Sequence, residues 1–254
     1  MPLKYQNRIV AYIDILGFTE MIKNTVREDN PETSSQNLNA IYNIVANFQE
    51  YFNQIRTRRG LKDNCSITMF SDLIVFSQPQ SESVGVLAMF EALKRLQINM
   101  LSKNILLRGS IVFGKLVHNQ NIVIGPALIN AYNVESKSAV YPRIVIDPKV
   151  MNLYVRKNGI IHRAGKKIKD LDYDITSDDF DGTYYIDYFN FVDDYLQNSK
   201  SSSYYEGMEK LIERGKKSQD TGIRMKYLWM DEKLKEAYDI MSRLKKTSDS
   251  PLHK

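Results

Sequence analysis

The stretch AYIDILGFT, residues 11–19, places one aspartate inside a run of residues that is otherwise typical of a buried strand. A second stretch, FSDLIVFS at 70–77, repeats the pattern around Asp72. A carboxylate in such surroundings is costly unless a cation or a metal ion pairs with it. The alternative is that Asp14 caps a strand end and that Asp72 is an ordinary turn residue, because aspartate is common in turns. Since both aspartates are embedded in apolar strands, the sequence favours metal ligation.

The segments around these stretches predict a mixed α/β fold. Strands are expected over 8–16, 65–70, 72–77 and 141–147, with two or three more within 106–125 and a turn at 118–121. Apolar residues at helical spacing predict helices over 38–55, 84–101 and 125–139, and the serines and asparagine before residue 38 are N-cap candidates. Hairpins interrupt the alternation of strands and helices, so we expect a mixed, mainly antiparallel sheet flanked by helices rather than a purely parallel one.

The character of the chain changes after Pro148, which divides it into an expected core at 1–150 and a mostly helical extension at 151–254 that packs on the core. Residues 180–196 predict either a strand or a docking helix, and two helical stretches follow from Tyr204 to Lys246, with Trp229 expected to pack them against the core. The acidic loop at 172–182 lacks the final acid of a calcium-binding EF-hand, where Tyr188 stands instead, and is therefore expected to be solvated.

Composition limits the class of protein. The 254 residues carry a formal net charge of +5, but the basic residues form only short clusters, so nucleic-acid binding is not expected. A nucleic-acid-binding regulator that uses the basic tail stays open as an alternative function. The single cysteine, Cys65, excludes an internal disulfide and a cysteine-based zinc site. No apolar run approaches the ~18 residues of a membrane helix, and the chain begins without a leader-like segment, so a cytoplasmic protein without membrane association is expected. The histidines have no metal-binding spacing and are expected to face solvent: His118, His162 and His253.

Four motifs occur in a set order: an aspartate followed by Leu-Gly-Phe, a second aspartate in a hairpin, a strand with Arg-Gly-x-x-x-x-Gly, and a helix that begins with Gly-Pro-Ala. Over residues 8–147 this order resembles the class III nucleotidyl cyclase catalytic domain, the ferredoxin-like fold shared by adenylate, guanylate and bacterial pyrimidine cyclases. The resemblance implies a homodimer with active sites between the subunits. It also implies conversion of a nucleoside triphosphate to a 3′,5′-cyclic monophosphate and pyrophosphate.

The resemblance assigns the two aspartates to the metal site. Asp14 and Asp72 would hold two Mg²⁺ or Mn²⁺ ions, and the backbone carbonyl of Ile15 would complete the shell of one ion. Oxygen ligands of this kind suit both metals. Arg108 matches an arginine that contacts phosphate or supports the site. The main-chain amides expected to hold phosphate lie at a strand-to-helix turn: Leu16, Gly17, Phe18 and Thr19.

The positions that read the base differ from those of the purine cyclases. Thr68 stands where those enzymes carry a lysine, and Ser71 replaces the glycine before the second aspartate. Pro126 replaces the acid that is the second base reader. A hydroxyl cannot reproduce the hydrogen bonds of a lysine, so UTP or CTP is the expected substrate. The pyrimidine cyclases of bacterial antiviral signalling, which make cUMP or cCMP, also depart from the purine pattern, and antiviral defence follows by analogy alone.

The helix at 125–139 also departs from the family, in which an asparagine and an arginine four residues apart stabilise the transition state. Aligned on Glu135, Ile129 and Asn133 take these two places, and Asn130 fits the first place only with a one-residue shift. Lys137 could supply the cation, or Arg143 could reach in. The missing arginine leaves open a second function, a catalytically silent cyclase fold that binds nucleotide or a partner protein.

Overall fold

The computed structural model describes residues 3–26, 31–58, 65–80, 83–119, 122–158, 176–189 and 200–248. The first half of its elements is β1 (Gln6–Ile15), α1 (Phe18–Lys23), α2 (Pro31–Arg58), β2 (Ser66–Phe70), β3 (Leu73–Pro79), α3 (Ser83–Leu101) and β4 (Leu107–Asn119). The second half is β5 (Ile122–Ile124), α4 (Pro126–Ser138), β6 (Ile144–Ile146), α5 (Pro148–Asn158), β7 (Thr176–Asp178), β8 (Tyr184–Ile186), α6 (Lys200–Lys216) and α7 (Thr221–Ser248).

The strands of the described segments form one mixed sheet in the order β2-β3-β1-β4-β6-β8-β7, and β5 pairs with β4 beside it. Of these pairs β4–β6 is parallel, and the others are antiparallel. The predicted mixed, mainly antiparallel sheet with flanking helices is therefore confirmed.

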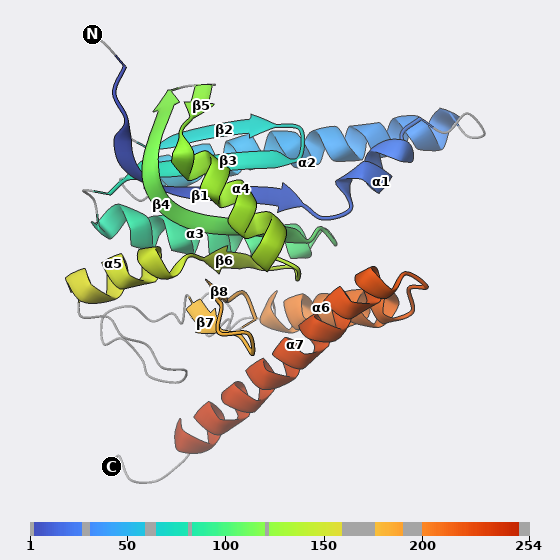
Figure 1. The fold of residues 1–254 in the computed structure, drawn as a ribbon. Coiled ribbons are helices and arrows are strands. Elements are labelled where there is room, and N and C mark those ends of the chain that lie inside the picture. Colours follow the sequence, from blue (N-terminus) through green and yellow to red (C-terminus); the bar gives the residue numbers. More distant parts are fainter. Residues whose placement is uncertain are drawn as a thin grey trace.

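Helices cover both faces of this sheet (Figure 1). Ile9, Ala11 and Ile13 of β1 point to the face that packs against α2 and α3. The residue between two of them, Val10, points to the opposite face and packs with Ala131 of α4. This alternation follows from the two-residue period of a strand. Asp14 has the same parity as Val10 and therefore lies on the α4 face.

The C-terminal helices pack as an antiparallel pair below the sheet (Figure 1). Their apolar side chains join those of β8 in a separate aromatic cluster that includes Tyr185, Phe189 and Trp229. Trp229 is 3% exposed and stacks on Tyr141 with ring centroids 5.3 Å apart, so its predicted packing role is confirmed. Strands β7 and β8, which belong to the expected C-terminal extension, continue the sheet of the core. The predicted boundary between core and extension at residue 150 falls within α5, and the division into two domains stays a prediction.

Two helices differ from the expectation. Helix α2 begins at Pro31 rather than near residue 38, because a proline in the first turn followed by Glu32 is a favourable helix start. Helix α5, which also begins with a proline, was not predicted. Within the described residues, no helix combines the length and the apolar character needed to cross a membrane.

Candidate active site

The two aspartates singled out in the sequence meet on the α4 face of the sheet. Asp14 lies near the end of β1, and Asp72 lies in the tight turn between β2 and β3. Ser71, beside Asp72 in this turn, has a φ of 56°, a left-handed conformation that costs a non-glycine residue about 1–2 kcal/mol. The sequence was expected to form a tight hairpin here, and it does.

The Asp14 carboxyl group lies near enough to Asp72 for the charge of Asp72 to raise its pKa. Burial raises this pKa, and the nearby guanidinium of Arg108 lowers it. The negative charge of Asp72 raises it further. Two carboxylates this close disfavour the charged state of each other unless a cation lies between them.

Arg108 links this pair to helix α4. In the register of β1 and β4 it lies opposite Asp14, and its Nε donates to Oδ2 of Asp14 at 2.9 Å. The same Nε lies 2.7 Å from Oε1 of Glu135, a buried residue of α4. Oε1 of Glu135 has no hydrogen-bond partner within the described structure, because the single hydrogen on Nε points to Asp14. The contact with Glu135 is therefore an ion pair without a well-aligned hydrogen bond.

Glu135 and Tyr12 also belong to this cluster, although neither was predicted as a site residue. Burial raises the pKa of Glu135, Arg108 lowers it, and Asp14 raises it again. Burial also raises the pKa of Tyr12, with further contributions from Glu135, Asp14, Tyr132 and Asp72. The Tyr12 ring meets the edge of the Tyr132 ring at 6.1 Å between centroids.

Periodicity could have found both residues. Tyr12 lies two positions before Asp14 on the same strand, so the two side chains share a face. Glu135 follows the buried Ala127 and Ala131 at intervals of four on α4 and therefore points toward the sheet.

The charges of this cluster fit a divalent cation. Asp14, Asp72 and Glu135 supply three carboxyl groups, against the one guanidinium of Arg108. Asp14 is 22% exposed at its side chain and can be reached from solvent. Among the described residues no set of three His, Cys, Asp or Glu side chains is arranged to hold a metal ion. Two carboxylates are nevertheless enough for Mg²⁺, which is usually held by one or two carboxylates together with water and substrate phosphate.

Thr68 lies on β2, where its hydroxyl contacts a histidine rather than pointing into an open site. Its Oγ1 is 2.9 Å from Nε2 of His118, whose Nδ1 is 2.7 Å from Oγ of Ser77. Nε of Arg8 donates to the same Ser77 hydroxyl at 2.8 Å. The prediction that His118 faces solvent is wrong, because the ring is buried between these partners. It lies near the end of β4, a strongly curved strand (Figure 1). Burial, and then the charge of Arg8, lower the pKa of His118 to about 4. His162 and His253 lie outside the described residues.

The expected phosphate-binding segment connects β1 to the short helix α1. Gly17 has a φ of 80°, a left-handed conformation that glycine adopts at little cost. The Leu16 amide donates to the Leu106 carbonyl at 2.9 Å and is therefore not available to a phosphate. Phe18 places its side chain in the core, whereas Thr19 is exposed. Ile15, the expected source of a carbonyl ligand, has a buried side chain in the last position of β1.

Helix α4 carries the other expected site residues. Pro126 is its first residue, and Asn130 is half-buried. Asn133 and Lys137 are exposed, on the side of the helix opposite to Glu135 and the sheet. The structure therefore brings together Asp14, Asp72 and Arg108, and leaves Asn133 and Lys137 pointing outward.

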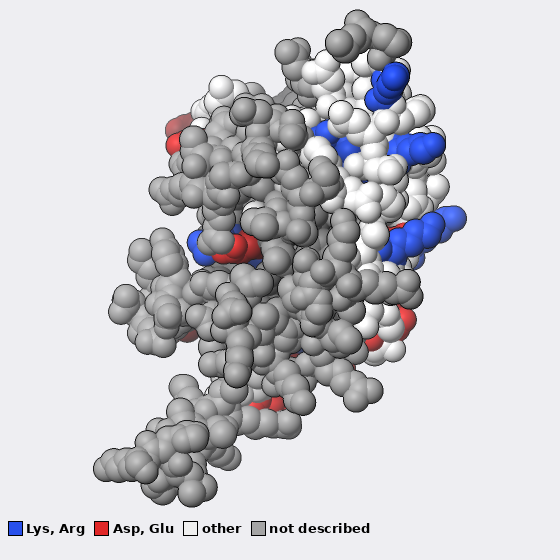
Figure 2. All heavy atoms as spheres, turned by 90° about the vertical axis from the view of Figure 1, so that its left-hand side faces the viewer, with Lys and Arg blue, Asp and Glu red and all other residues white. Residues whose placement is uncertain are grey.

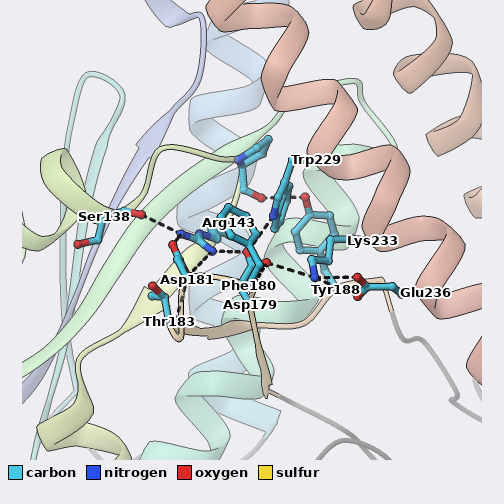
Figure 3. A network of polar contacts seen from close by, with 11 residues as sticks. Ser138, Arg143, Asp179, Phe180, Asp181, Thr183, Tyr188, Trp229, Lys233 and Glu236 are labelled. Carbon is cyan, nitrogen blue, oxygen red and sulfur yellow. Dashed lines mark hydrogen bonds and ion pairs between the residues drawn. The ribbon is translucent and has the colours of Figure 1, made fainter.

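Arg143 does not reach this site. Its side chain is fully buried, and its guanidinium pairs with Asp179 and Asp181 (Figure 3). Trp229 and Lys233 of α7 approach the same Asp179 carboxylate, with Nε1 at 2.8 Å from Oδ2 and Nζ at 3.2 Å from Oδ1. The alternative in which Arg143 replaces the missing catalytic arginine is therefore wrong.

The same network corrects the expected solvated loop. Asp179 is 7% exposed, because Arg143 and Lys233 supply the partners that allow a carboxylate to be buried. Burial would raise the pKa of Asp181, but its hydrogen bonds from Arg143 and Thr183 lower it to about 2. Arg143 also donates to the carbonyl of Ser138, the last residue of α4, at 3.1 Å. Residues 172–175 of the expected loop lie outside the described residues.

Figure 2 shows one face of the molecule, on which the described Lys and Arg side chains lie in separate groups rather than in one continuous strip.

No protein-family model matches the chain, and a comparison with curated proteins found no match. Solved structures do match, among them the adenylyl cyclase CyaB from P. aeruginosa, with 16% identity over 74% of this chain and 96% of that chain and a TM-score of 0.44. The monomeric guanylyl cyclase domain of the RhoGC fusion protein from the aquatic fungus Blastocladiella emersonii matches at 16% identity over 72% and 95%, with a TM-score of 0.42.

An adenylate/guanylate cyclase/hydrolase from Silicibacter pomeroyi matches at 13% identity over 72% of this chain and 96% of that chain, with a TM-score of 0.42. These are remote similarities in chain path.

Proposed function

We propose that this protein is a metal-dependent nucleotidyl cyclase that converts a nucleoside triphosphate, UTP or CTP in preference to a purine nucleotide, to a 3′,5′-cyclic monophosphate and pyrophosphate. The observation that carries the proposal is the hydrogen bond from Arg108 to Asp14, a carboxyl group that also lies within the influence of the charge of Asp72. In the reaction the 3′-oxygen forms a bond to the α-phosphorus, the bond to the pyrophosphate oxygen breaks, and the 3′-hydroxyl proton is released.

The residues of the site have distinct tasks in this proposal. Asp14 and Asp72 would hold two Mg²⁺ or Mn²⁺ ions, with the carbonyl of Ile15 as a further ligand. When bound, such ions neutralise the triphosphate and lower the pKa of the attacking hydroxyl. Arg108 would contact a phosphate from the neighbouring strand. The amides of Gly17, Phe18 and Thr19 would contact phosphate at the start of α1.

A homodimer completes the proposed site. Asn133 and Lys137 are exposed on the outer side of α4, and Ile129 and Tyr132 on the same helix are large apolar residues that are more than half exposed. Burial of this surface against a second copy would give Asn133 and Lys137 access to that copy's Asp14 and Asp72. Each active site would then combine residues of two subunits.

The preference for a pyrimidine rests on the base-reading positions. Pro126 has no side-chain hydrogen-bonding group, and Thr68 has a short hydroxyl that contacts His118. Neither residue can replace the lysine and the acid of the purine cyclases.

A second candidate function is a cyclase-fold module that binds a nucleotide without converting it. The burial of Arg143 favours this candidate, because the cation available on α4 is then Lys137, which lacks the planar fork of an arginine. The intact pair of Asp14 and Asp72 favours the enzyme.

Product formation separates the two candidates. Purified protein would be incubated with Mn²⁺ and each of the four ribonucleoside triphosphates, and the products would be separated by mass. We expect one cyclic monophosphate, absent in Asp14→Ala and Asp72→Ala and retained in Asp239→Asn, which removes a carboxylate from the exposed side of α7. Binding of a triphosphate by a folded dimer without any product would instead support the binding module.

A further inference from the structure

Glu135 and Asp14 compete for the same hydrogen-bond donor, Nε of Arg108. The single hydrogen on Nε of Arg108 can serve one acceptor at a time, and two carboxylate oxygens lie within 3 Å of it. It is directed to Asp14 at 2.9 Å. The Oε1 atom of Glu135, at 2.7 Å, is buried and has no hydrogen bond within the described structure.

A buried carboxylate oxygen without a hydrogen bond is an unfavourable arrangement, so a state in which Arg108 turns to Glu135 satisfies it. That state leaves Asp14 without its cation. The like charge of Asp72 beside it then makes Asp14 a strong acceptor for another positive charge. Because both acceptor oxygens lie within 3 Å of the same nitrogen, reorientation of this one guanidinium would exchange the two states.

We propose that Glu135 is a positioning residue that accepts Arg108 when Asp14 turns from Arg108 to a divalent cation. This inference rests on the proposed function, because it assumes a cation at Asp14 and Asp72. Since Glu135 belongs to α4, cation binding would also tighten the attachment of this helix to β4. The helix that carries Asn133 and Lys137 is then held most firmly when the metal site is filled.

A double-mutant cycle on Mn²⁺ binding tests this role without any catalytic step. Mn²⁺ is titrated into nucleotide-free protein, and free Mn²⁺ is measured by its electron paramagnetic resonance signal. The proteins are wild type, Glu135→Gln, Arg108→Gln, the double variant, Asp72→Asn as the site knock-out, and Ser136→Ala as a control on the exposed side of the same helix.

We expect Glu135→Gln to weaken Mn²⁺ binding about tenfold, a typical coupling between two sites, because Arg108 then stays on Asp14. In the Arg108→Gln background the same substitution should have a much smaller effect, since no guanidinium remains to occupy Asp14. Ser136→Ala should bind as wild type. The fluorescence of Trp229 checks that each variant is folded. This residue is buried in the aromatic cluster and belongs to a different cluster of side chains from the substituted residues.

Two results would overturn the inference alone: unchanged Mn²⁺ binding in Glu135→Gln, or an equal loss in both backgrounds, which is the plain effect of removing one negative charge. Equal Mn²⁺ binding by wild type and Asp72→Asn, or none by either, would instead remove the proposed cation site and the role of Glu135 with it. The failure of the positioning role and the failure of the proposed function are therefore distinguishable.

Discussion

Arg108 and Asp14 lie directly opposite each other in the antiparallel register of β4 and β1, and Nε of Arg108 donates to Oδ2 of Asp14 at 2.9 Å. One guanidinium thus serves a cluster that also contains the carboxyl groups of Asp72 and Glu135. An excess of negative charge of this kind is unfavourable for folding. It is typical of sites that bind a positively charged ligand.

Removal of one carboxylate from the cluster should therefore stabilise the metal-free protein. We expect Asp72→Asn to raise the free energy of unfolding at neutral pH by about 0.5–1 kcal/mol in the presence of a chelator. Urea denaturation measures the change, and Asp239→Asn on the exposed side of α7 is the control for loss of a charge. A less stable Asp72→Asn protein would show that the two carboxyl groups do not repel each other.

The buried network around Arg143 predicts a large loss on substitution. Arg143→Met leaves Asp179 buried without its main partner, which should cost about 3 kcal/mol of unfolding free energy. Lys216→Met removes a surface ion pair to Glu213 and should cost about 1 kcal/mol or less. Urea denaturation gives both values. The fluorescence of Trp229, the single tryptophan, should shift to the red if α7 loosens in Arg143→Met. Equal costs for the two substitutions would contradict the structural role of the network.

His118 predicts a specific dependence of stability on pH. Its pKa is about 4 in the folded protein against an ordinary value of 6.5, so the unfolded chain binds a proton more readily between these values. The stability that comes from the neutral ring is therefore present above pH 6.5 and is lost as the pH falls toward 4. The loss amounts to about 3 kcal/mol.

Urea denaturation of wild type and His118→Gln at a series of pH values measures this effect. The variant should show a shallower decline between pH 6.5 and 4, because its amide does not take up a proton. If the unfolding free energies of the two proteins fell in parallel with pH, the His118 ring would have the same pKa in the folded and unfolded states, and the prediction would be wrong.

Two glycines of helix α6 predict opposite effects of the same substitution. A Cβ at Gly207 meets nothing within 4 Å. Gly207→Ala should therefore stabilise the protein by about 0.4–1 kcal/mol, because alanine lowers the conformational entropy of the unfolded chain. A Cβ at Gly215 would lie 2.0 Å from the ring of Tyr227 on α7, so Gly215→Ala should destabilise it by about 1–3 kcal/mol.

Thermal unfolding of the two alanine variants, side by side, checks this difference. A stable Gly215→Ala protein would indicate that α6 and α7 are not packed as closely as the structure has them.

Much of the fold was predictable because its signals are local. Apolar residues recur at a period of two in β1 and β3 and at helical spacing in α3 and α4, and these periods indicate which faces are buried. The predicted bounds of these four elements differ from the observed ones by a few residues at most. The start of α2 was missed because the polar residues after Pro31 carry no apolar pattern, although a proline followed by an acid is itself a start signal.

The candidate site was predictable only in part. Asp14 and Asp72 stood out because each interrupts an apolar strand, and Arg108 because of its motif. Glu135 and Tyr12 were missed, since a glutamate on a helix and a tyrosine on a strand are ordinary residues until their faces are known to meet. Asn133 and Lys137 stay predictions, because their proposed partners belong to a second subunit.

The sequence by itself determined the strands and the long helices up to residue 147, the buried faces of β1, β3, α3 and α4, and the two aspartates that interrupt apolar strands. Only the tertiary structure decided which polar groups meet. His118 is buried because it lies between Thr68 and Ser77, and Arg143 is fixed away from the site because α7 and the β7–β8 turn enclose it with Asp179. Such contacts join residues about 36 to 54 positions apart, and no local period encodes them. They form only after the hydrophobic faces have packed, because a buried charge or polar group then needs a partner within the packed structure.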